Sequence, residues 1–417
     1  MKTKLAEHIR DTPEGKEADQ ILRACVHCGF CTATCPTYQL LGDELDSPRG
    51  RIYLMKELLE GNAVTQKTQL HLDRCLTCRA CETTCPSGVR YGRLVDIGRN
   101  IVEREVRRPL AQSAIRTALR TVLPNPRLFK PLLAIGQTLR PLLPGALKRK
   151  VPMRAADAGD WPESRHARTM LVLDGCVQPM LAPDINPAAA RVLDRIGVSL
   201  VKAESAGCCG AVTFHLNRQD DALAFMRRNI DAWWPHIEAG AEALVMTASG
   251  CGAMVRDYAH LLAHDPDYAD KARRVTALCR DLSEVMADEH EAIARLLSEA
   301  SGEQPEEKPR LAFHSPCSLQ HAQQIRGKAE ALLIAAGFEL THVPDSHLCC
   351  GSAGTYSILQ SQLSQRLLKN KVTALSSGRP QSIATANIGC LSHLQTGTAL
   401  PVRHWIEMLA DKLEAKK

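Results

Sequence analysis

Two stretches of the chain each place four cysteines at one fixed spacing and end in proline. In chain order their residues are Cys25, Cys28, Cys31, Cys35 and Pro36 in the first run, and Cys75, Cys78, Cys81, Cys85 and Pro86 in the second. Both runs follow C-x₂-C-x₂-C-x₃-C-P without a deviation. Thiols at such short and regular intervals converge on a common point, so the first hundred residues must fold around whatever these thiols bind.

The cellular compartment decides whether cysteines pair with each other or bind metal. The chain has 17 cysteines in 417 residues. Its N-terminus, beginning Met1-Lys-Thr-Lys, is charged and lacks the apolar core of a signal peptide. No stretch approaches the roughly 18 apolar residues of a membrane-spanning helix. We therefore expect a protein of the reducing cytoplasm, in which clustered cysteines serve as metal ligands.

The spacing of both runs is typical of proteins that hold two [4Fe–4S] clusters, in which the fourth cysteine of each run ligates the other cluster. We therefore assign Cys25, Cys28, Cys31 and Cys85 to one cluster, and Cys75, Cys78, Cys81 and Cys35 to the other. Two structural zinc sites are the alternative, but they would leave the third cysteine and the proline of each run unexplained. His27 either donates a hydrogen bond to a cluster sulfur or is a solvated neighbour.

The region from about residue 169 to the end repeats itself. Its two copies share the order Cys, Cys-Cys-Gly, Cys, and equivalent cysteines are 141, 141 and 139 residues apart. The cysteines are Cys176, Cys208, Cys209 and Cys251 in the first copy, and Cys317, Cys349, Cys350 and Cys390 in the second. In each copy an apolar strand leads into the first cysteine, and another leads into the last.

Strands that alternate with helices predict α/β units with largely parallel sheets. After the first cysteine of each copy we expect a helix, capped by Asn186 in the first copy and closed by Gly197 or Gly337. Sites in such sheets form beyond the carboxyl ends of the strands, so the eight cysteines are candidates for a further redox or metal site. Buried structural thiols are the alternative. Cys279 belongs to neither pattern, and we expect an inert thiol in a helical stretch.

A basic, proline-rich segment separates the two halves. Residues 104–168 contain 14 Lys or Arg against 4 Asp or Glu, with eight prolines, while the whole chain has a net charge of +6. The prolines exclude one long helix and indicate a linker of short helices. There are three alternatives for its basic side chains: they are solvated, they contact anionic lipid, or they bind an acidic partner subunit. Nucleic-acid binding is not expected, because the segment lacks the interleaved aromatic side chains on which bases stack.

The sequence as a whole predicts an α plus α/β protein. Its segments are a helical two-cluster domain (1–103), the basic linker (104–168) and two Cys-Cys-Gly repeats (169–300 and 301–417). The first also contains a helix expected over residues 52–60, with Ile52, Met55, Leu58 and Leu59 on one face. No glycine-rich dinucleotide motif follows a predicted strand.

Beyond these patterns, the chain resembles the iron–sulfur subunits of glycolate oxidase (glycolate dehydrogenase) over nearly its whole length. The stretches that carry this likeness are 23–36, 42–46 (Gly-Asp-Glu-Leu-Asp), 47–51 (Ser-Pro-Arg-Gly-Arg), 231–235 (Asp-Ala-Trp-Trp-Pro) and 344–351. The Cys-Cys-Gly repeats also resemble those of anaerobic glycerol-3-phosphate dehydrogenase, lactate-oxidation and heterodisulfide reductase subunits.

The resemblance implies an N-terminal domain like that of the succinate dehydrogenase iron–sulfur subunit. It also implies partner subunits that carry FAD and oxidise glycolate to glyoxylate, with electrons passing through this chain toward the quinone pool. The hydride chemistry itself needs a flavin or nicotinamide, so no catalytic residue is expected in this chain. A protein with these partners is expected on the inner face of the cell membrane. Lactate or glycerol-3-phosphate is the alternative substrate.

One departure concerns a third cluster. In the heterodisulfide reductase relative each repeat ends in C-x₂-C and holds a noncubane cluster. Here Ala248 and Asn387 stand three residues before Cys251 and Cys390. Each repeat is therefore one cysteine short of that pattern, so the sequence does not decide whether the repeats hold a third cluster.

Overall fold

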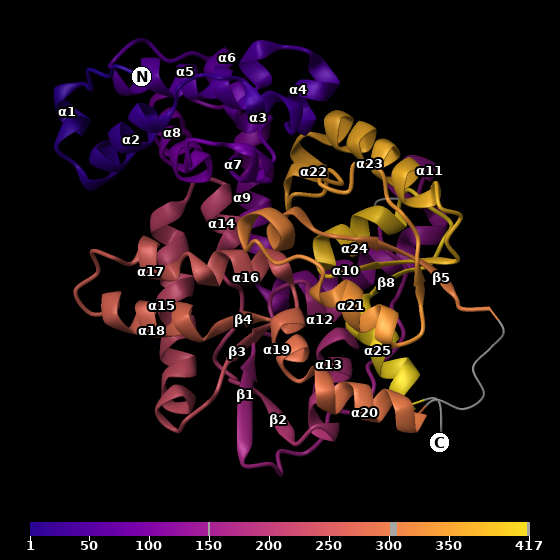
Figure 1. Cartoon of the computed structure of the whole chain (residues 1–417). Coiled ribbons are helices and arrows are strands. Elements are labelled where there is room, and N and C mark those ends of the chain that lie inside the picture. Colours follow the sequence, from indigo (N-terminus) through magenta and orange to yellow (C-terminus); the bar gives the residue numbers. More distant parts are fainter. Residues whose placement is uncertain (149–150, 301–306, 415–417) are drawn as a thin grey trace.

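The computed structural model describes residues 1–148, 151–300 and 307–414. A helical N-terminal domain lies against two α/β repeats (Figure 1). The elements of the N-terminal domain are α1 (Glu7–Arg10), α2 (Pro13–Ala24), α3 (Phe30–Ala33), α4 (Pro36–Leu41), η1 (Glu44–Asp46), α5 (Pro48–Leu59), α6 (Gln66–Asp73), α7 (Ala80–Thr84) and α8 (Tyr91–Glu105).

The helices α2, α5 and α6 begin at capping residues whose side chains satisfy free backbone N–H groups. Ser47 caps α5 by accepting a hydrogen bond from the backbone N–H of Gly50, and Pro48 occupies the first helical position. The predicted helix over 52–60 is therefore present, but it begins one turn earlier. Its predicted apolar face is buried, with Met55 fully enclosed. This face closes the core of the domain beneath the cysteine runs.

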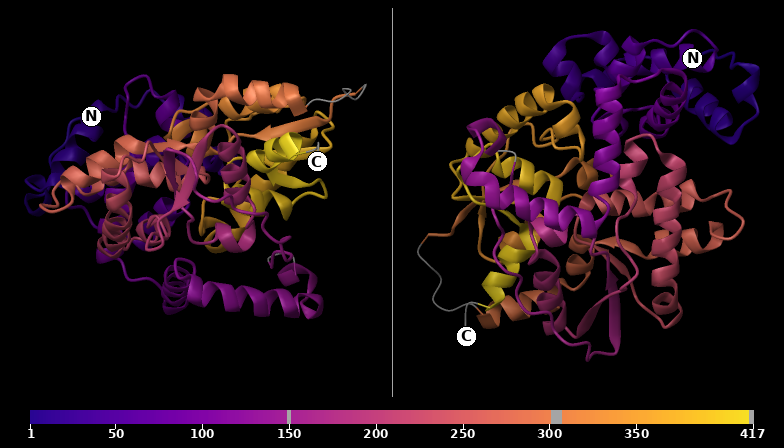
Figure 2. Two further views of the ribbon diagram at one scale, coloured as in Figure 1. Left: turned by 90° about the horizontal axis from the view of Figure 1, so that it is seen from below. Right: turned by 180° about the vertical axis from the view of Figure 1, so that it is seen from behind.

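The segment between the N-terminal domain and the first strand contains further helices. They are α9 (Leu110–Val122), α10 (Pro126–Leu139), η2 (Arg140–Leu142) and α11 (Gly145–Lys148). Figure 2 shows that α10 runs as a separate layer behind the two repeats. Within the described chain, no residue of α10 is buried.

Each repeat contains a four-stranded parallel sheet. The first comprises β1 (Arg168–Val172), β2 (Val198–Lys202), β3 (Leu244–Met246) and β4 (Cys279–Asp281), in the order β2-β1-β3-β4. The second comprises β5 (Arg310–His314), β6 (Glu339–Leu340), β7 (Ser382–Thr385) and β8 (Val402–His404), in the order β6-β5-β7-β8. The identical order confirms the predicted duplication, and every pairing is parallel.

Helices surround both sheets. In the first repeat they are α12 (Gln178–Leu181), α13 (Ile185–Arg195), α14 (Ala211–His215), α15 (Gln219–Glu238), α16 (Ser249–Arg256), α17 (Tyr258–Leu261), α18 (Ala269–Leu278), α19 (Leu282–Asp288) and α20 (His290–Ala300). In the second they are the π-helix η3 (Ser318–Ala322), then α21 (Lys328–Ala335), α22 (Tyr356–Leu359), α23 (Ser361–Ser376), α24 (Ile388–Gln395) and α25 (Trp405–Glu414).

The two repeats share one hydrophobic core. It joins Leu193 of α13 to Trp405 and Leu409 of α25, all fully buried. The last helix of the chain therefore packs on the first repeat, where Arg195 donates to the carbonyl oxygen of Leu413 at 2.6 Å. The repeats thus form one packed body rather than two separate ones.

Two sequence predictions about the first repeat were wrong. Asn186 does not cap its helix: α13 begins at Ile185, and the Asn186 side chain instead accepts hydrogen bonds from Gln178 and Thr247. Cys279 lies at the start of β4, not in a helix, because α18 ends at Leu278. Gly197 and Gly337 do follow their helices, both in the left-handed conformation that glycine adopts readily. The segment boundaries stay a prediction, and α8 extends past residue 103.

Candidate metal centres

Both N-terminal cysteine runs fold into the same tight loop. Its second and third non-cysteine positions are left-handed: φ is 57° at His27 and 89° at Gly29 in the first run, and 52° at Thr77 and 58° at Arg79 in the second. Left-handed residues turn the chain back on itself. Three of these four residues carry a side chain, and such residues adopt a positive φ only where the surrounding structure imposes it. The loops therefore curl so that the cysteines face inward.

The two loops enclose two cavities that exchange cysteines. The first, of about 430 Å³ with its open mouth included, is lined by Cys25, Cys28, Cys31, Cys81 and Cys85. The second, of about 300 Å³, is lined by Cys35, Cys75, Cys78 and Cys81. Thus the fourth cysteine of each run reaches the cavity of the other run. Each predicted ligand set lines one cavity, while ligation itself stays a prediction.

The thiols of these cavities are the donors that an iron–sulfur cluster needs. Burial raises the pKa of Cys31 to about 11 and holds the pKa of Cys81 well above its usual value. Such thiols lose their protons when a cation is bound among them. The Nε2 atom of His27 is buried beside the first cavity without a hydrogen-bond partner among the described residues. An acceptor inside the cavity, such as a cluster sulfur, would satisfy it.

Cys75 is held differently from the other thiols. Burial raises its pKa, but the guanidinium groups of Arg51 and Arg99 outweigh this effect and lower the pKa overall. Its Sγ also accepts hydrogen bonds from the backbone N–H of Thr77 at 3.3 Å and from the hydroxyl of Tyr91 at 3.6 Å. Cys75 is therefore prepared to be a thiolate.

The stretch 42–51, for which the sequence predicted no structural role, contains two residues of a buried charge network. Asp46 is fully buried and accepts hydrogen bonds from Arg51 at 3.2 Å, Arg74 at 2.8 Å and His71 at 3.1 Å. Arg51, itself 1% exposed, also donates to the carbonyl oxygen of His71. The network ties the segment after Cys35 to the helix that leads into Cys75. Its function is to hold the two runs in register.

In the repeats, the cysteines come together as predicted. Cys176 and Cys317 follow β1 and β5, while Cys251 and Cys390 lie in the helices after β3 and β7. In both repeats the thiols neighbour one another in the order first cysteine, Cys-Cys pair, last cysteine. Cys317 and Cys349, for example, have their sulfurs 3.8 Å apart.

The glycine of each Cys-Cys-Gly is required by the backbone. Gly351 has a φ of 89°, and a Cβ there would lie 2.7 Å from the carbonyl oxygen of Ser364. Its N–H donates to the Sγ of Cys349 at 3.4 Å. Gly210 makes the equivalent bond to Cys208 at the same distance. The motif is therefore a turn that points its first sulfur at a backbone donor.

The second repeat touches the N-terminal domain at its cysteines. Cys78, Cys317 and Cys349 belong to one apolar cluster with Leu76 and Tyr356. The first repeat contacts the same domain through charge, because Asp257 pairs with Arg79 and Arg93 at 2.8 and 2.7 Å. The second cavity therefore lies beside the thiols of the second repeat. Cys279 takes no part: its pKa is raised to about 12, with burial the largest cause.

Known protein families match the N-terminal domain and the two repeats separately. A family model described as a 4Fe–4S dicluster domain matches residues 21–89, and one described as a cysteine-rich domain matches 170–256 and 311–395. The chain is 57% identical over 414 residues to the glycolate oxidase iron–sulfur subunit of Escherichia coli K12, which covers 99% of this chain and 100% of the relative.

More distant relatives match in part. A probable glycolate oxidase iron–sulfur subunit of Bacillus subtilis is 30% identical over 405 residues, covering 89% of this chain and 88% of the relative. The lactate utilization protein A of Bacillus subtilis is 26% identical over 223 residues, covering 52% of this chain and 87% of that protein. The chain belongs to the family of glycolate oxidase iron–sulfur subunits.

Proposed function

We propose that this chain is the electron-transfer subunit of a glycolate-oxidising complex, with one [4Fe–4S] cluster held by Cys25, Cys28, Cys31 and Cys85 and another by Cys75, Cys78, Cys81 and Cys35. The observation that carries the proposal is the pair of cavities that exchange their fourth cysteines. Bound clusters would supply one-electron carriers between a two-electron flavin and a quinone. Flavin-bearing partner subunits would oxidise the substrate.

The protein's own residues give the cavities their properties. Arg51 and Arg99 place positive charge beside Cys75, which stabilises thiolate ligands and the added charge of a reduced centre. An apolar cluster around Leu76 and Tyr356 lies between Cys78 and the cysteines of the second repeat. Such an apolar contact favours a redox partner at this face, on either the same chain or another subunit.

Glycolate is favoured over lactate as the substrate of the complex because the glycolate oxidase relatives match a larger share of this chain. The glycolate oxidase relatives match 99% and 89% of this chain, whereas the lactate utilization relative matches 52%. Purified complex should therefore reduce an artificial dye with glycolate at a kcat/KM at least about tenfold above that with lactate or glycerol-3-phosphate. Equal turnover of lactate would overturn the substrate assignment.

The division of labour can be tested with single cysteine variants. In the assembled complex, Cys28→Ala or Cys78→Ala should abolish glycolate-driven quinone reduction while leaving reduction of a flavin-coupled dye. The matched control is Cys279→Ala, a buried thiol outside both cavities, which should keep both activities. Co-purification of the partner subunits establishes assembly. Persistent quinone reduction in both variants would contradict the proposal.

We further propose that the linker helices dock on an anionic membrane surface. Among the described residues, no helix is long and apolar enough to cross a membrane. The helix α10 nevertheless exposes Leu128, Leu132, Ile135 and Leu139, which recur at helical spacing on one face. Leu110 of α9 and Leu142 of η2 are also exposed, at 89% and 81%.

Charge identifies the occupant of this surface. No Asp or Glu occurs between residues 106 and 156, while Arg127, Lys130 and Arg140 lie along α10 and at its end. An apolar face with basic and no acidic side chains along its helix fits anionic head groups and the acyl chains below them. This placement would bring the complex to the inner face of the cell membrane and its quinone.

Vesicle flotation tests the docking surface. The purified complex should float with vesicles containing phosphatidylglycerol, and Leu132→Glu with Ile135→Glu should reduce the bound fraction at least about fivefold. Ile334→Glu, which changes an exposed isoleucine of α21, is the matched control and should bind like the wild type. If the double variant instead lost a partner subunit and kept vesicle binding, the surface would be a subunit interface.

A further inference from the structure

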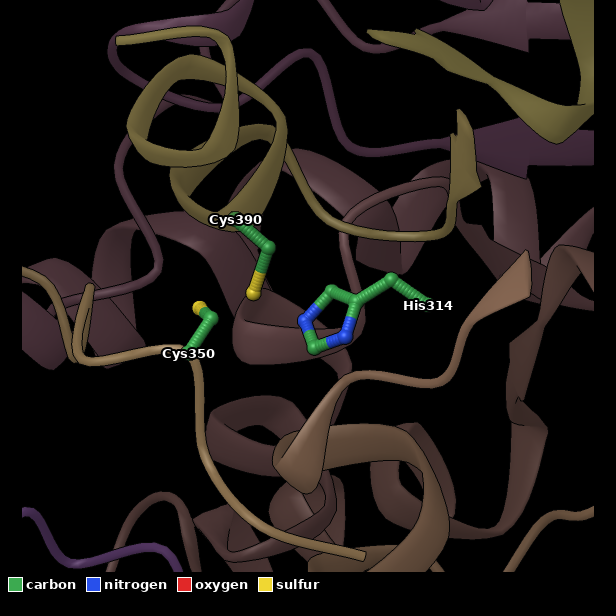
Figure 3. A group of neighbouring side chains, drawn as sticks. All are labelled: His314, Cys350 and Cys390. Carbon is green, nitrogen blue, oxygen red and sulfur yellow. The ribbon is translucent and has the colours of Figure 1, made fainter. Parts of the chain in front are cut away.

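A histidine joins two of the repeat cysteines in the interior of the second repeat. His314 is the last residue of β5, Cys350 is the second cysteine of the Cys-Cys-Gly turn, and Cys390 lies in α24. One potential ligand atom from each lies within 4.8 Å of the other two. Figure 3 shows the imidazole ring turned toward both sulfurs. All three residues are at least nine-tenths buried, with exposed fractions of 2%, 1% and 5%.

The imidazole lacks the hydrogen bond that such burial requires. The Nε2 atom of His314 is buried without a hydrogen-bond partner among the described residues. It is also the ring nitrogen that faces the two sulfurs (Figure 3). An unpartnered buried polar atom destabilises a fold, so its place beside two thiols needs an explanation. A cation bound between the nitrogen and the sulfurs would provide it.

The donor set selects the kind of cation. Two thiolates and one imidazole are ligands that Zn²⁺ prefers, and three protein ligands leave a fourth position for water. Zinc–sulfur bonds of about 2.3 Å keep the donors of one ion within about 4.6 Å of each other. The three donor atoms lie within 4.8 Å of one another, so a single ion would draw them slightly closer together. An iron–sulfur cube would need its thiolates farther apart.

The first repeat lacks the third ligand. Leu173 stands three residues before Cys176, as His314 stands three residues before Cys317. The thiols of Cys209 and Cys251 are adjacent there, as those of Cys350 and Cys390 are here, but the neighbouring side chain is a buried leucine. The sequence duplication was not preserved at this point, and the imidazole is specific to the second repeat.

We propose that His314, Cys350 and Cys390 bind one Zn²⁺ ion, separate from the two N-terminal centres. The ion would join the end of β5, the Cys-Cys-Gly turn and α24 at a single point. It would thereby fix the turn whose other cysteine, Cys349, packs near Cys78. The ion would link these elements without carrying electrons, because Zn²⁺ does not change its redox state.

Metal analysis and X-ray absorption of the anaerobically purified wild-type chain test the site directly. We expect about one zinc per chain in addition to iron, with a zinc edge spectrum fitted by two sulfurs near 2.3 Å and nitrogen or oxygen near 2.0–2.1 Å. Wild-type protein without zinc, zinc bound by four sulfurs, or iron in place of zinc at this site would each overturn the proposal.

Variants then assign the ligands. His314→Leu, which copies the residue of the first repeat, should lower zinc at least about tenfold while iron stays at the wild-type level. Cys209→Ser, at the position of the first repeat that corresponds to Cys350, is the matched control and should retain zinc. Equal zinc in both variants would remove His314 from the site. If His314→Leu fails to fold, the wild-type absorption spectrum still decides the question.

Discussion

The hydroxyl of Tyr91 donates a hydrogen bond to the Sγ of Cys75 across 3.6 Å, and the same tyrosine lines both N-terminal cavities. It is fully enclosed at the start of α8. A donor aimed at a ligand sulfur stabilises the more negative, reduced state of the centre that the sulfur serves. Tyr91 is thus placed to set the potential of one centre while it packs against the other.

Removing this hydroxyl should lower the midpoint potential of the centre at Cys75. Tyr91→Phe keeps the ring but loses one hydrogen bond, so we expect a decrease of a few tens of millivolts for a one-electron couple. EPR-monitored potentiometry measures it. Tyr356→Phe is the matched control, because that hydroxyl donates to the carbonyl oxygen of Arg74 instead of a sulfur. A potential unchanged in Tyr91→Phe would show that the contact has no electronic effect.

Substitution of Cys35 should disturb the centre of the other run. Cys35 lines the second cavity although it belongs to the first run. The EPR spectrum of Cys35→Ser should therefore resemble that of Cys78→Ser and differ from that of Cys28→Ser. The reciprocal variant, Cys85→Ser, should resemble Cys28→Ser. The opposite grouping of these spectra would assign each run to its own cluster.

Loss of Arg51 should destabilise the N-terminal domain strongly. Arg51→Met leaves Asp46 buried with one charge partner fewer, which typically reduces the free energy of unfolding by about 3–5 kcal/mol. Urea unfolding followed by the visible absorption of the bound clusters measures the loss. Arg49→Met removes an exposed pair with Glu44 and should reduce stability by less than about 1 kcal/mol. Similar losses in both variants would mean that burial of the network is unimportant.

The contact between the repeats should weaken in acid. His404 donates from Nε2 to the carbonyl oxygen of Thr247 at 2.9 Å and accepts the N–H of Ile406 at Nδ1, so its ring must stay neutral. Burial lowers its pKa to about 3, against about 6.5 in the unfolded chain. Stability from this group is complete above pH 6.5 and declines as the pH falls toward 3.

Between pH 6.5 and pH 5 the loss from this histidine amounts to about 1–2 kcal/mol. His404→Gln keeps a donor for Thr247 but cannot titrate, so its unfolding free energy should fall less over this range. Denaturant unfolding of both proteins at the two pH values provides the measurement. Parallel pH profiles would indicate that His404 is accessible to protons in the folded protein.

The sequence predicted those features that depend on spacing. Eight cysteines at fixed intervals predicted two centres with exchanged ligands, and the recurrence of Cys-Cys-Gly predicted two equivalent sheets. Features that depend on single side chains brought together by tertiary structure were missed. His314 is one histidine at the end of a strand, and no local pattern distinguishes it until the fold brings it to Cys350 and Cys390. Likewise, the sequence does not show that Asp46 and Arg51 form a buried ion pair, because only the fold brings both side chains into the interior.

Local signals also failed where the tertiary structure offered a stronger partner. Asn186 precedes a proline and would make a good helix cap, but Gln178 and Thr247 engage its side chain within the core. Asp184 takes the position before the helix without a side-chain cap hydrogen bond. Cys279 follows a helical pattern directly, and only pairing with β3 determines that the chain is extended there.

The packing of α25 on the first repeat also governs the order in which the protein can be completed on the ribosome. The N-terminal domain has its own core, formed by residues up to Val106, so it can close early in synthesis. One face of the first repeat cannot be covered at that stage, because Leu193 of α13 packs against Trp405 and Leu409, which follow it by more than 200 residues. Nascent chains therefore pass through a stage in which the cysteine runs are folded while the repeats still expose apolar surface. A chain that lacked α25 would keep every cysteine in place, yet the apolar face of α13 would stay exposed.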